Sequence, residues 1–155
     1  MAGGLLRAIA SFAPVAVGSD ATRESLYLAI DVCLALGVAT FCASLSKLAD
    51  WRASAGFGIA LAGIAIIRMN RRISVVDLYP AGALGVAIGV LMLSVSGWRA
   101  GRLRAWVPGA FVLSPALGIA GTVLPDAGFL FVGSGVLFGI AFVALGAAAW
   151  SATSR

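Results

Sequence analysis

The strongest constraint on the fold is a run of uncharged, mostly apolar residues from Leu78 to Trp98. A helix needs roughly 20 such residues to cross the hydrocarbon core of a bilayer. Asp77 and Arg99 enclose the run, so its length matches one membrane-spanning helix. Pro80 lies in the first turn, where a helix tolerates proline. We therefore predict a transmembrane helix over this run.

Charge is scarce over the whole chain, and this excludes a water-soluble domain. Only 11% of the 155 residues are charged and 61% are hydrophobic, whereas a soluble domain is about 25% charged. The net charge of +5 comes from short basic groups between apolar runs, which is typical of loops beside membrane spans and not of a nucleic-acid-binding surface. We predict an integral, multi-pass protein of a prokaryotic cell membrane that contacts lipid and no nucleic acid.

Five apolar runs have the length and the flanking residues of membrane spans. The predicted spans are residues 26–46, 53–67, 78–98, 105–124 and 127–149. The run 53–67 is the shortest, and it crosses the bilayer only if the Arg68 side chain extends to the headgroups. The prediction is an all-α integral membrane protein in which residues 25–155 form one bundle of five transmembrane helices.

Residues 1–24 differ from the rest because their apolar positions are spaced along one face. Leu5, Ile9 and Phe12 give a modest apolar face, which Arg7 and Pro14 interrupt. This pattern is typical of a helix that lies on the bilayer surface. We predict an N-terminal interfacial amphipathic helix, and the sequence leaves open whether it lies on or crosses the membrane.

Two stretches, residues 51–98 and 106–150, repeat one pattern. The motif Gly-x-x-x-Gly at Gly85 and Gly89 recurs at Gly135 and Gly139, and apolar residues follow both copies up to a tryptophan. We predict two homologous helix hairpins in tandem. Glycines four residues apart leave a flat strip where another helix can approach closely. Packing within the bundle and contact with another subunit are both open for these glycines.

The aromatic residues support the predicted spans. The four tryptophans lie at span ends that an alternating topology brings to one membrane face. Tyr27 and Tyr79 begin spans and fall at the opposite face. Indole and phenol rings favour the headgroup region of a bilayer.

Asp31 is the charged residue inside a predicted span, and it is the candidate intramembrane polar site. A carboxylate in hydrocarbon is costly, so an intramembrane acid is a candidate proton or cation site. A structural interpretation competes with this one, because Asp31 lies only about 9 Å along the helix from Ser25 and reaches headgroup water or a loop arginine. Pro115 predicts a kink in the fourth span, which is either a static bend or part of a substrate route.

Arginines between the spans are candidates for contact with lipid headgroups. They are Arg68, Arg71, Arg72, Arg99, Arg102 and Arg104. The chain has no histidine, no phosphate-binding loop, no nucleophile elbow and no paired carboxylates. We therefore predict no enzymatic activity and no catalytic, cofactor or metal site.

The two helix pairs in tandem, the tryptophan that opens each pair and Ser114-Pro115 resemble the small bacterial SPW-repeat membrane proteins. The likeness covers residues 51–150 and departs from the family pattern where Ala116 replaces the expected tryptophan. The segment Lys47–Asp50 is also similar to DoxX-type four-span proteins, but their acidic residue after the later proline is absent. Neither family implies a catalytic site.

Three functional hypotheses follow from these features. The favoured one is a non-enzymatic accessory subunit that packs against other transmembrane helices, in a homo-oligomer or a larger membrane complex. The alternative is a small transporter or channel subunit that uses Asp31 and the kink at Pro115. The third is a quinone- or redox-linked accessory protein, which would require a bound chromophore.

Overall fold

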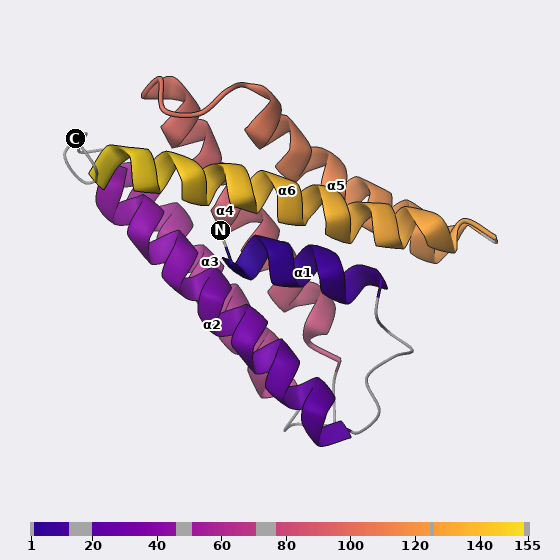
Figure 1. Ribbon diagram of the computed structural model, residues 1–155. Coiled ribbons are helices and arrows are strands. Elements are labelled where there is room, and N and C mark those ends of the chain that lie inside the picture. The colour runs from indigo at the N-terminus through magenta and orange to yellow at the C-terminus, as the bar shows by residue number, and fades with distance from the viewer. Residues whose placement is uncertain (1, 13–19, 46–50, 71–76, 125, 154–155) are drawn as a thin grey trace.

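The computed structural model describes residues 2–12, 20–45, 51–70, 77–124 and 126–153 (Figure 1). These residues form six α-helices and no strand. In chain order the helices are α1 (Ala2–Phe12), α2 (Asp20–Leu45), α3 (Trp51–Asn70), α4 (Tyr79–Arg99), α5 (Trp106–Val123) and α6 (Gly128–Thr153).

The five helices α2 to α6 are long and apolar enough to cross a membrane. The predicted all-α, multi-pass architecture is therefore confirmed. The helices extend beyond several predicted span ends: α2 begins at Asp20 instead of Leu26, α3 continues to Asn70 instead of Ile67, and α6 continues to Thr153 instead of Ala149. Helix α2 begins at Asp20, within the segment 1–24, because no glycine or proline breaks the chain between Asp20 and Ser25.

The helix ends follow from local signals in the sequence. Asp77 accepts a hydrogen bond from the backbone N–H of Tyr79 at 3.0 Å, and Pro80 occupies the first turn of α4. At the other end of α4, Gly101 has a φ of +69°, a conformation that glycine adopts without strain. Asp126, with a φ of +63°, makes the corresponding reversal between α5 and α6.

The helices form two antiparallel pairs, α3 with α4 and α5 with α6 (Figure 1). Helix α2 contacts α3 and α4 of the first pair and α6 of the second. Figure 1 shows α2 and α6 meeting near their C-terminal ends and diverging toward the opposite ends. Helix α1 lies in the angle between them and contacts both. The bundle is thus two helix pairs joined by α2 and by a direct contact between α4 and α5, with the short helix α1 placed where α2 and α6 separate.

Two adjacent glycines fit α1 between its neighbours. A Cβ on Gly3 would lie 2.9 Å from the carbonyl carbon of Cys33 in α2. A Cβ on Gly4 would lie 2.5 Å from the carbonyl oxygen of Gly139 in α6. Both contacts fall near the middle of the longer helices, whereas Leu5 and Ile9 on the outer side of α1 are exposed. The contacts therefore hold α1 beside two candidate spans, and its predicted position at the membrane surface stays a prediction.

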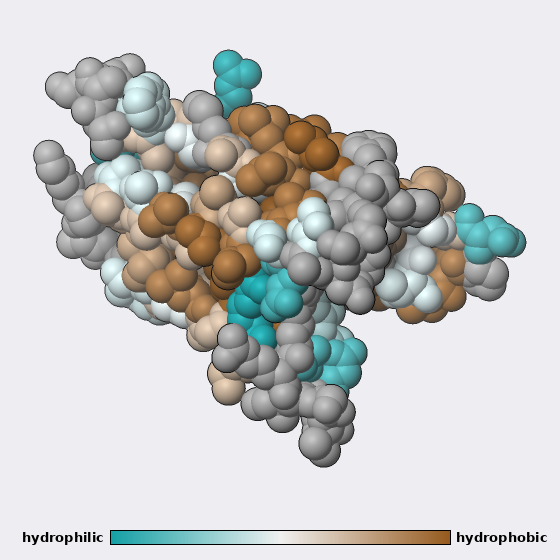
Figure 2. All heavy atoms as spheres, turned by 60° about the horizontal axis from the view of Figure 1, so that its bottom comes forward, coloured by the Kyte–Doolittle hydropathy of each residue, from teal (hydrophilic) through white to brown (hydrophobic). Residues whose placement is uncertain are grey.

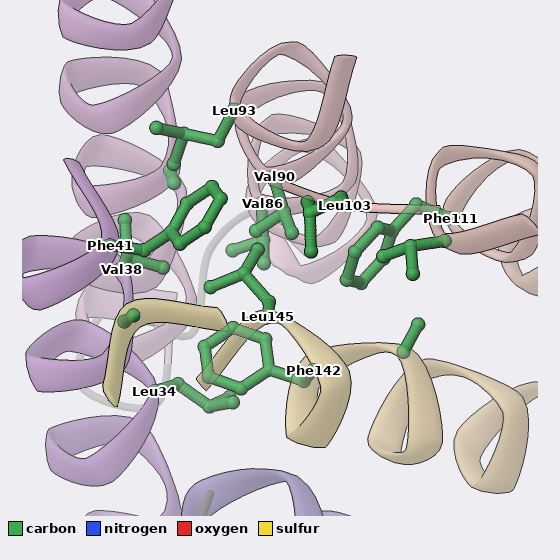
Figure 3. Close-up of a cluster of buried hydrophobic side chains, with 14 of the residues drawn as sticks. Leu34, Val38, Phe41, Val86, Val90, Leu93, Leu103, Phe111, Phe142 and Leu145 are labelled. Atoms are coloured by element: carbon green, nitrogen blue, oxygen red, sulfur yellow. The ribbon is translucent and has the colours of Figure 1, made fainter. Parts of the chain in front are cut away.

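The core lies where α2, α4, α5 and α6 meet (Figure 3). Phe41 of α2, Phe111 of α5 and Phe142 of α6 are almost completely buried there. Phe138 joins the last two, because its ring meets Phe111 edge to face at 5.4 Å and stacks on Phe142 at 6.0 Å. These rings connect the second helix pair to α2, since a Cβ on Gly37 would lie 2.6 Å from the Phe142 ring.

The outer surface is suited to lipid. Figure 2 shows one face, on which brown, hydrophobic residues cover most of the described area and teal, hydrophilic groups are few and separate. The four tryptophans are 46–74% exposed, and each lies in the first or last turn of its helix. The antiparallel order of α3 to α6 brings these four helix ends to the same side of the bundle, as the sequence analysis predicts.

Candidate functional site

The candidate polar site, Asp31, forms an ion pair with Arg68 of α3. The Nε atom of Arg68 lies 2.6 Å from Oδ2 of Asp31, and the two side chains are 24% and 20% exposed, respectively. Because α2 and α3 run in opposite directions, the last turn of α3 meets the first half of α2. Placing one charged side chain at the centre of a membrane helix costs about 2.5–3.5 kcal/mol of insertion free energy. An ion pair reduces this cost, because the opposite charges largely cancel each other's field.

The geometry at Arg68 leaves part of the guanidinium without a hydrogen bond. Its Nε–H is not aligned with the carboxylate, so the 2.6 Å contact is an ion pair and not a well-formed hydrogen bond. The Nη2 atom is also buried and has no hydrogen-bond partner. A guanidinium carries five N–H donors, and buried donors normally have partners. The Arg68 guanidinium therefore has N–H donors that Asp31 does not accept.

A second polar group closes the same end of the bundle. The side-chain amide of Asn70 donates a 2.9 Å hydrogen bond to Asp77, and its oxygen accepts one of 2.6 Å from the backbone N–H of Leu78. Asn70 was not among the residues selected from the sequence. Its position could have identified it, because Asn70 follows one predicted span and precedes the start of the next. Backbone groups at helix ends need hydrogen-bond partners, and an asparagine side chain can supply them. Through these two hydrogen bonds, Asn70 links the end of α3 to the residues that precede α4.

The predicted packing glycines have different neighbours in the two repeats. Gly85 and Gly89 of α4 face α3, where a Cβ on Gly89 would lie 2.5 Å from the carbonyl oxygen of Gly56. Gly139 of α6 faces α1, where a Cβ would lie 2.6 Å from the carbonyl oxygen of Gly4. Gly135 of α6 is buried as well. The repeated motif therefore packs against two unrelated helices of the same chain.

The kink residue Pro115 lies beside a hydrogen bond between two helices. Ser114 is 3% exposed, and its hydroxyl donates to the carbonyl oxygen of Ser134 in α6 at 3.0 Å. The hydroxyl oxygen of Ser134 lies 3.3 Å from the hydroxyl oxygen of Ser114. This bridge is made by the residue directly before the proline, so it fastens α5 to α6 at the point where the proline interrupts the hydrogen bonds of α5.

The six candidate headgroup arginines fall into three groups. Arg68 contacts Asp31, and Arg71 and Arg72 lie outside the described residues. Arg99, Arg102 and Arg104 lie at the connection between α4 and α5. Elsewhere in the described chain, no three His, Cys, Asp or Glu side chains come together as metal ligands.

The candidate site residues therefore form three features: an ion pair between two candidate spans, close helix contacts at glycines, and a group of arginines at the connection between α4 and α5. Comparison with protein-family models, curated proteins and solved structures yields no match. The resemblance to SPW-repeat and DoxX-type proteins accordingly stays a prediction, and the site has to be interpreted from its own chemistry.

Proposed function

We propose that this protein is a non-enzymatic, multi-pass membrane protein that packs against other transmembrane helices, as a subunit of a homo-oligomer or of a larger membrane complex. The observation that carries the proposal is the outward face of α3. Ser54, Gly58 and Ala62 recur every four residues, and all three are exposed. A Cβ on Gly58 would meet no atom within 4 Å. In a bilayer, a face of small residues allows a second helix to approach closely.

The polar side chains inside the spans also favour a packing role. Asp31 forms an ion pair with Arg68, and the Ser114 hydroxyl donates a hydrogen bond to the carbonyl oxygen of Ser134 in α6. Both interactions join helices of this chain to one another. Such contacts support a fixed arrangement of helices, since a transported ion or solute would have to compete with them. We also propose a prokaryotic cell membrane as the location, on the basis of the resemblance to SPW-repeat proteins.

The first experiment is native mass spectrometry of the full chain in nanodiscs made directly from cell membranes. We expect a reproducible oligomer or one constant partner protein. Replacing Gly58 with leucine should release the partner, because the larger side chain holds the second helix away. The matched control is Gly109→Leu in α5, where the glycine is also exposed and a Cβ would meet no atom within 4 Å. A wild-type protein that is always a monomer with lipid alone would contradict the proposal.

The alternative function is a small transporter or channel subunit that uses Asp31 and the kink at Pro115. Its support is the ion pair between two candidate spans, together with the buried Nη2 atom of Arg68 that lacks a hydrogen bond. Intramembrane ionisable groups commonly mark proton or ion pathways.

Proton flux into liposomes, followed with a trapped pH-sensitive dye, distinguishes the two functions. A transporter should acidify or alkalinise the lumen faster than empty liposomes, and Asp31→Asn should abolish that flux while the oligomer mass stays the same. A packing protein should give the flux of empty liposomes. In that case the double variant Asp31→Asn/Arg68→Gln should still assemble, because it removes both charges together and leaves neither one unpaired in the membrane.

A further inference from the structure

The connection between α4 and α5 concentrates positive charge on a short ordered segment. Arg99, Arg102 and Arg104 fall within six residues, and no acidic residue occurs in the chain between Asp77 and Asp126. Both of those acids lie at the opposite ends of α4 and α5, on the far side of the bundle. The field of the three guanidinium groups is therefore not cancelled by a nearby carboxylate of this connection.

Backbone hydrogen bonds fix the shape of this connection. The N–H groups of Arg102 and Leu103 both donate to the carbonyl oxygen of Gly97, at 2.9 and 3.2 Å. Gly101 makes the reversal with its positive φ. Leu103 is 8% exposed, and its Cδ1 atom would lie 2.9 Å from a Cβ on Gly97. Because Leu103 anchors the segment in the core, the arginines on either side project from a rigid backbone.

The three arginines have no partner among the described residues. No ion pair or side-chain hydrogen bond joins Arg99, Arg102 or Arg104 to the described part of the chain. Arg99 and Arg104 are exposed, and Arg102 is half-buried. Arg68 makes the contrast clear, since its charge is paired with Asp31. The guanidinium groups of the connection are thus available to an external anion.

Two exposed tryptophans beside the arginines indicate the expected depth of this connection in a bilayer. Trp98 and Trp106 flank the connection and are 47% and 46% exposed. Exposed indole rings at the ends of membrane helices lie at the level of the lipid headgroups. The guanidinium groups between them consequently lie at the depth of the lipid phosphates.

We propose that the α4–α5 connection binds the headgroup of an anionic phospholipid through Arg99, Arg102 and Arg104. A guanidinium presents paired N–H donors that match two phosphate oxygens, and it keeps its charge at any physiological pH. Three such groups on an ordered backbone favour a headgroup with net negative charge over a zwitterionic one. This site goes beyond the proposed packing function, because it requires no second protein.

The test is native mass spectrometry of the purified full chain with phosphatidylglycerol and phosphatidylcholine of identical acyl chains. We expect the wild-type protein to retain phosphatidylglycerol preferentially and to lose the preference as salt is raised. The triple variant Arg99→Gln/Arg102→Gln/Arg104→Gln should weaken phosphatidylglycerol binding by roughly a hundredfold. The triple lysine variant, which keeps the charge but not the paired donors, should fall between the two.

The matched control is Arg52→Gln, an arginine on the same side of the bundle whose Cζ atom lies 5.5 Å from the centroid of the Trp51 ring. It should keep the preference for phosphatidylglycerol. The proposal is overturned if wild type binds both lipids equally, or if Arg52→Gln costs as much as the triple variant. Displacement of the lipid by millimolar inorganic phosphate, but not by sodium chloride of the same ionic strength, would also overturn it, because the site would then be one for free phosphate. If the triple glutamine variant does not fold, the salt dependence of the wild-type preference and the lysine variant still decide the question.

Discussion

The two helix pairs share a Gly-x-x-x-Gly motif in the sequence but are held together differently. In α3 and α4 the backbones touch over several turns, since Cβ atoms on Gly56, Gly63, Gly82 and Gly89 would all lie within 2.9 Å of atoms of the opposite helix. In α5 and α6 a comparably tight contact occurs near the turn, where a Cβ on Gly121 would lie 2.6 Å from the backbone nitrogen of Phe131.

Farther from that turn, larger groups separate α5 from α6. The Ser114–Ser134 hydrogen bond comes first, and the rings of Phe111 and Phe138 follow. The glycines of α6 consequently serve another neighbour, since Gly139 meets Gly4 of α1. A glycine motif therefore specifies a flat helix surface, whereas the residues on the facing helix decide which element packs against it.

The largest effect is expected from filling the contact between α3 and α4. Gly89→Val should destabilise the protein by about 3 kcal/mol or more, because its Cβ would overlap Ala60 and the carbonyl oxygen of Gly56. Unfolding in mixed detergent micelles, followed by circular dichroism, measures the loss. Gly109→Val is the control, since it places the same side chain at an exposed position with open space. Equal losses in the two variants would show that the close approach of α3 and α4 is not needed.

A smaller effect is expected when the same motif is filled in α6. Gly139→Val should displace α1 at a cost of about 1–2 kcal/mol, because α1 is short and can move away from α6. Hydrogen exchange of the α1 amides, measured by mass spectrometry, should become faster while exchange in α3 and α4 is unchanged. Gly133→Val, at a position with open space on α6, should leave the exchange of α1 as in wild type. If exchange rises throughout the chain instead, α1 and the five spans unfold as one unit.

The smallest effect is expected at the hydrogen bond that joins α5 to α6. Ser114→Ala should cost about 0.6 kcal/mol, which is the average value for hydrogen bonds between membrane helices. The same unfolding measurement applies. Thr122→Ala is the control, because the Thr122 hydroxyl bonds at 2.8 Å to a carbonyl oxygen of its own helix. If Ser114→Ala lowered the free energy of unfolding more than Gly89→Val, the order of the two effects would be reversed. The α5–α6 pair would then depend more on its polar contact than the α3–α4 pair depends on its glycines.

Much of the fold was predictable because a bilayer imposes strong local rules. Residues such as Leu78–Trp98 have no soluble alternative, so hydropathy located most of the spans, whereas the run 53–67 also required Arg68 to reach the headgroups. Tryptophans and short polar turns then marked their ends. The span around Ala60 was predicted too short, since hydropathy counts Arg68 against a helix. Asp31, which pairs with Arg68, lies in another helix, so a hydropathy average over adjacent residues does not include it.

The number of spans, their alternation and the placement of the tryptophans at one side could be predicted from the sequence, because each depends on residues close together in the chain. Three features became visible only in the packed molecule: Asp31 pairs with Arg68, Gly89 contacts α3 while Gly139 contacts α1, and α1 lies between α2 and α6. These contacts join segments that are far apart in the chain. Lipid surrounds every helix with an equally apolar medium, so the choice of neighbour depends on shape and on a few polar contacts between distant segments.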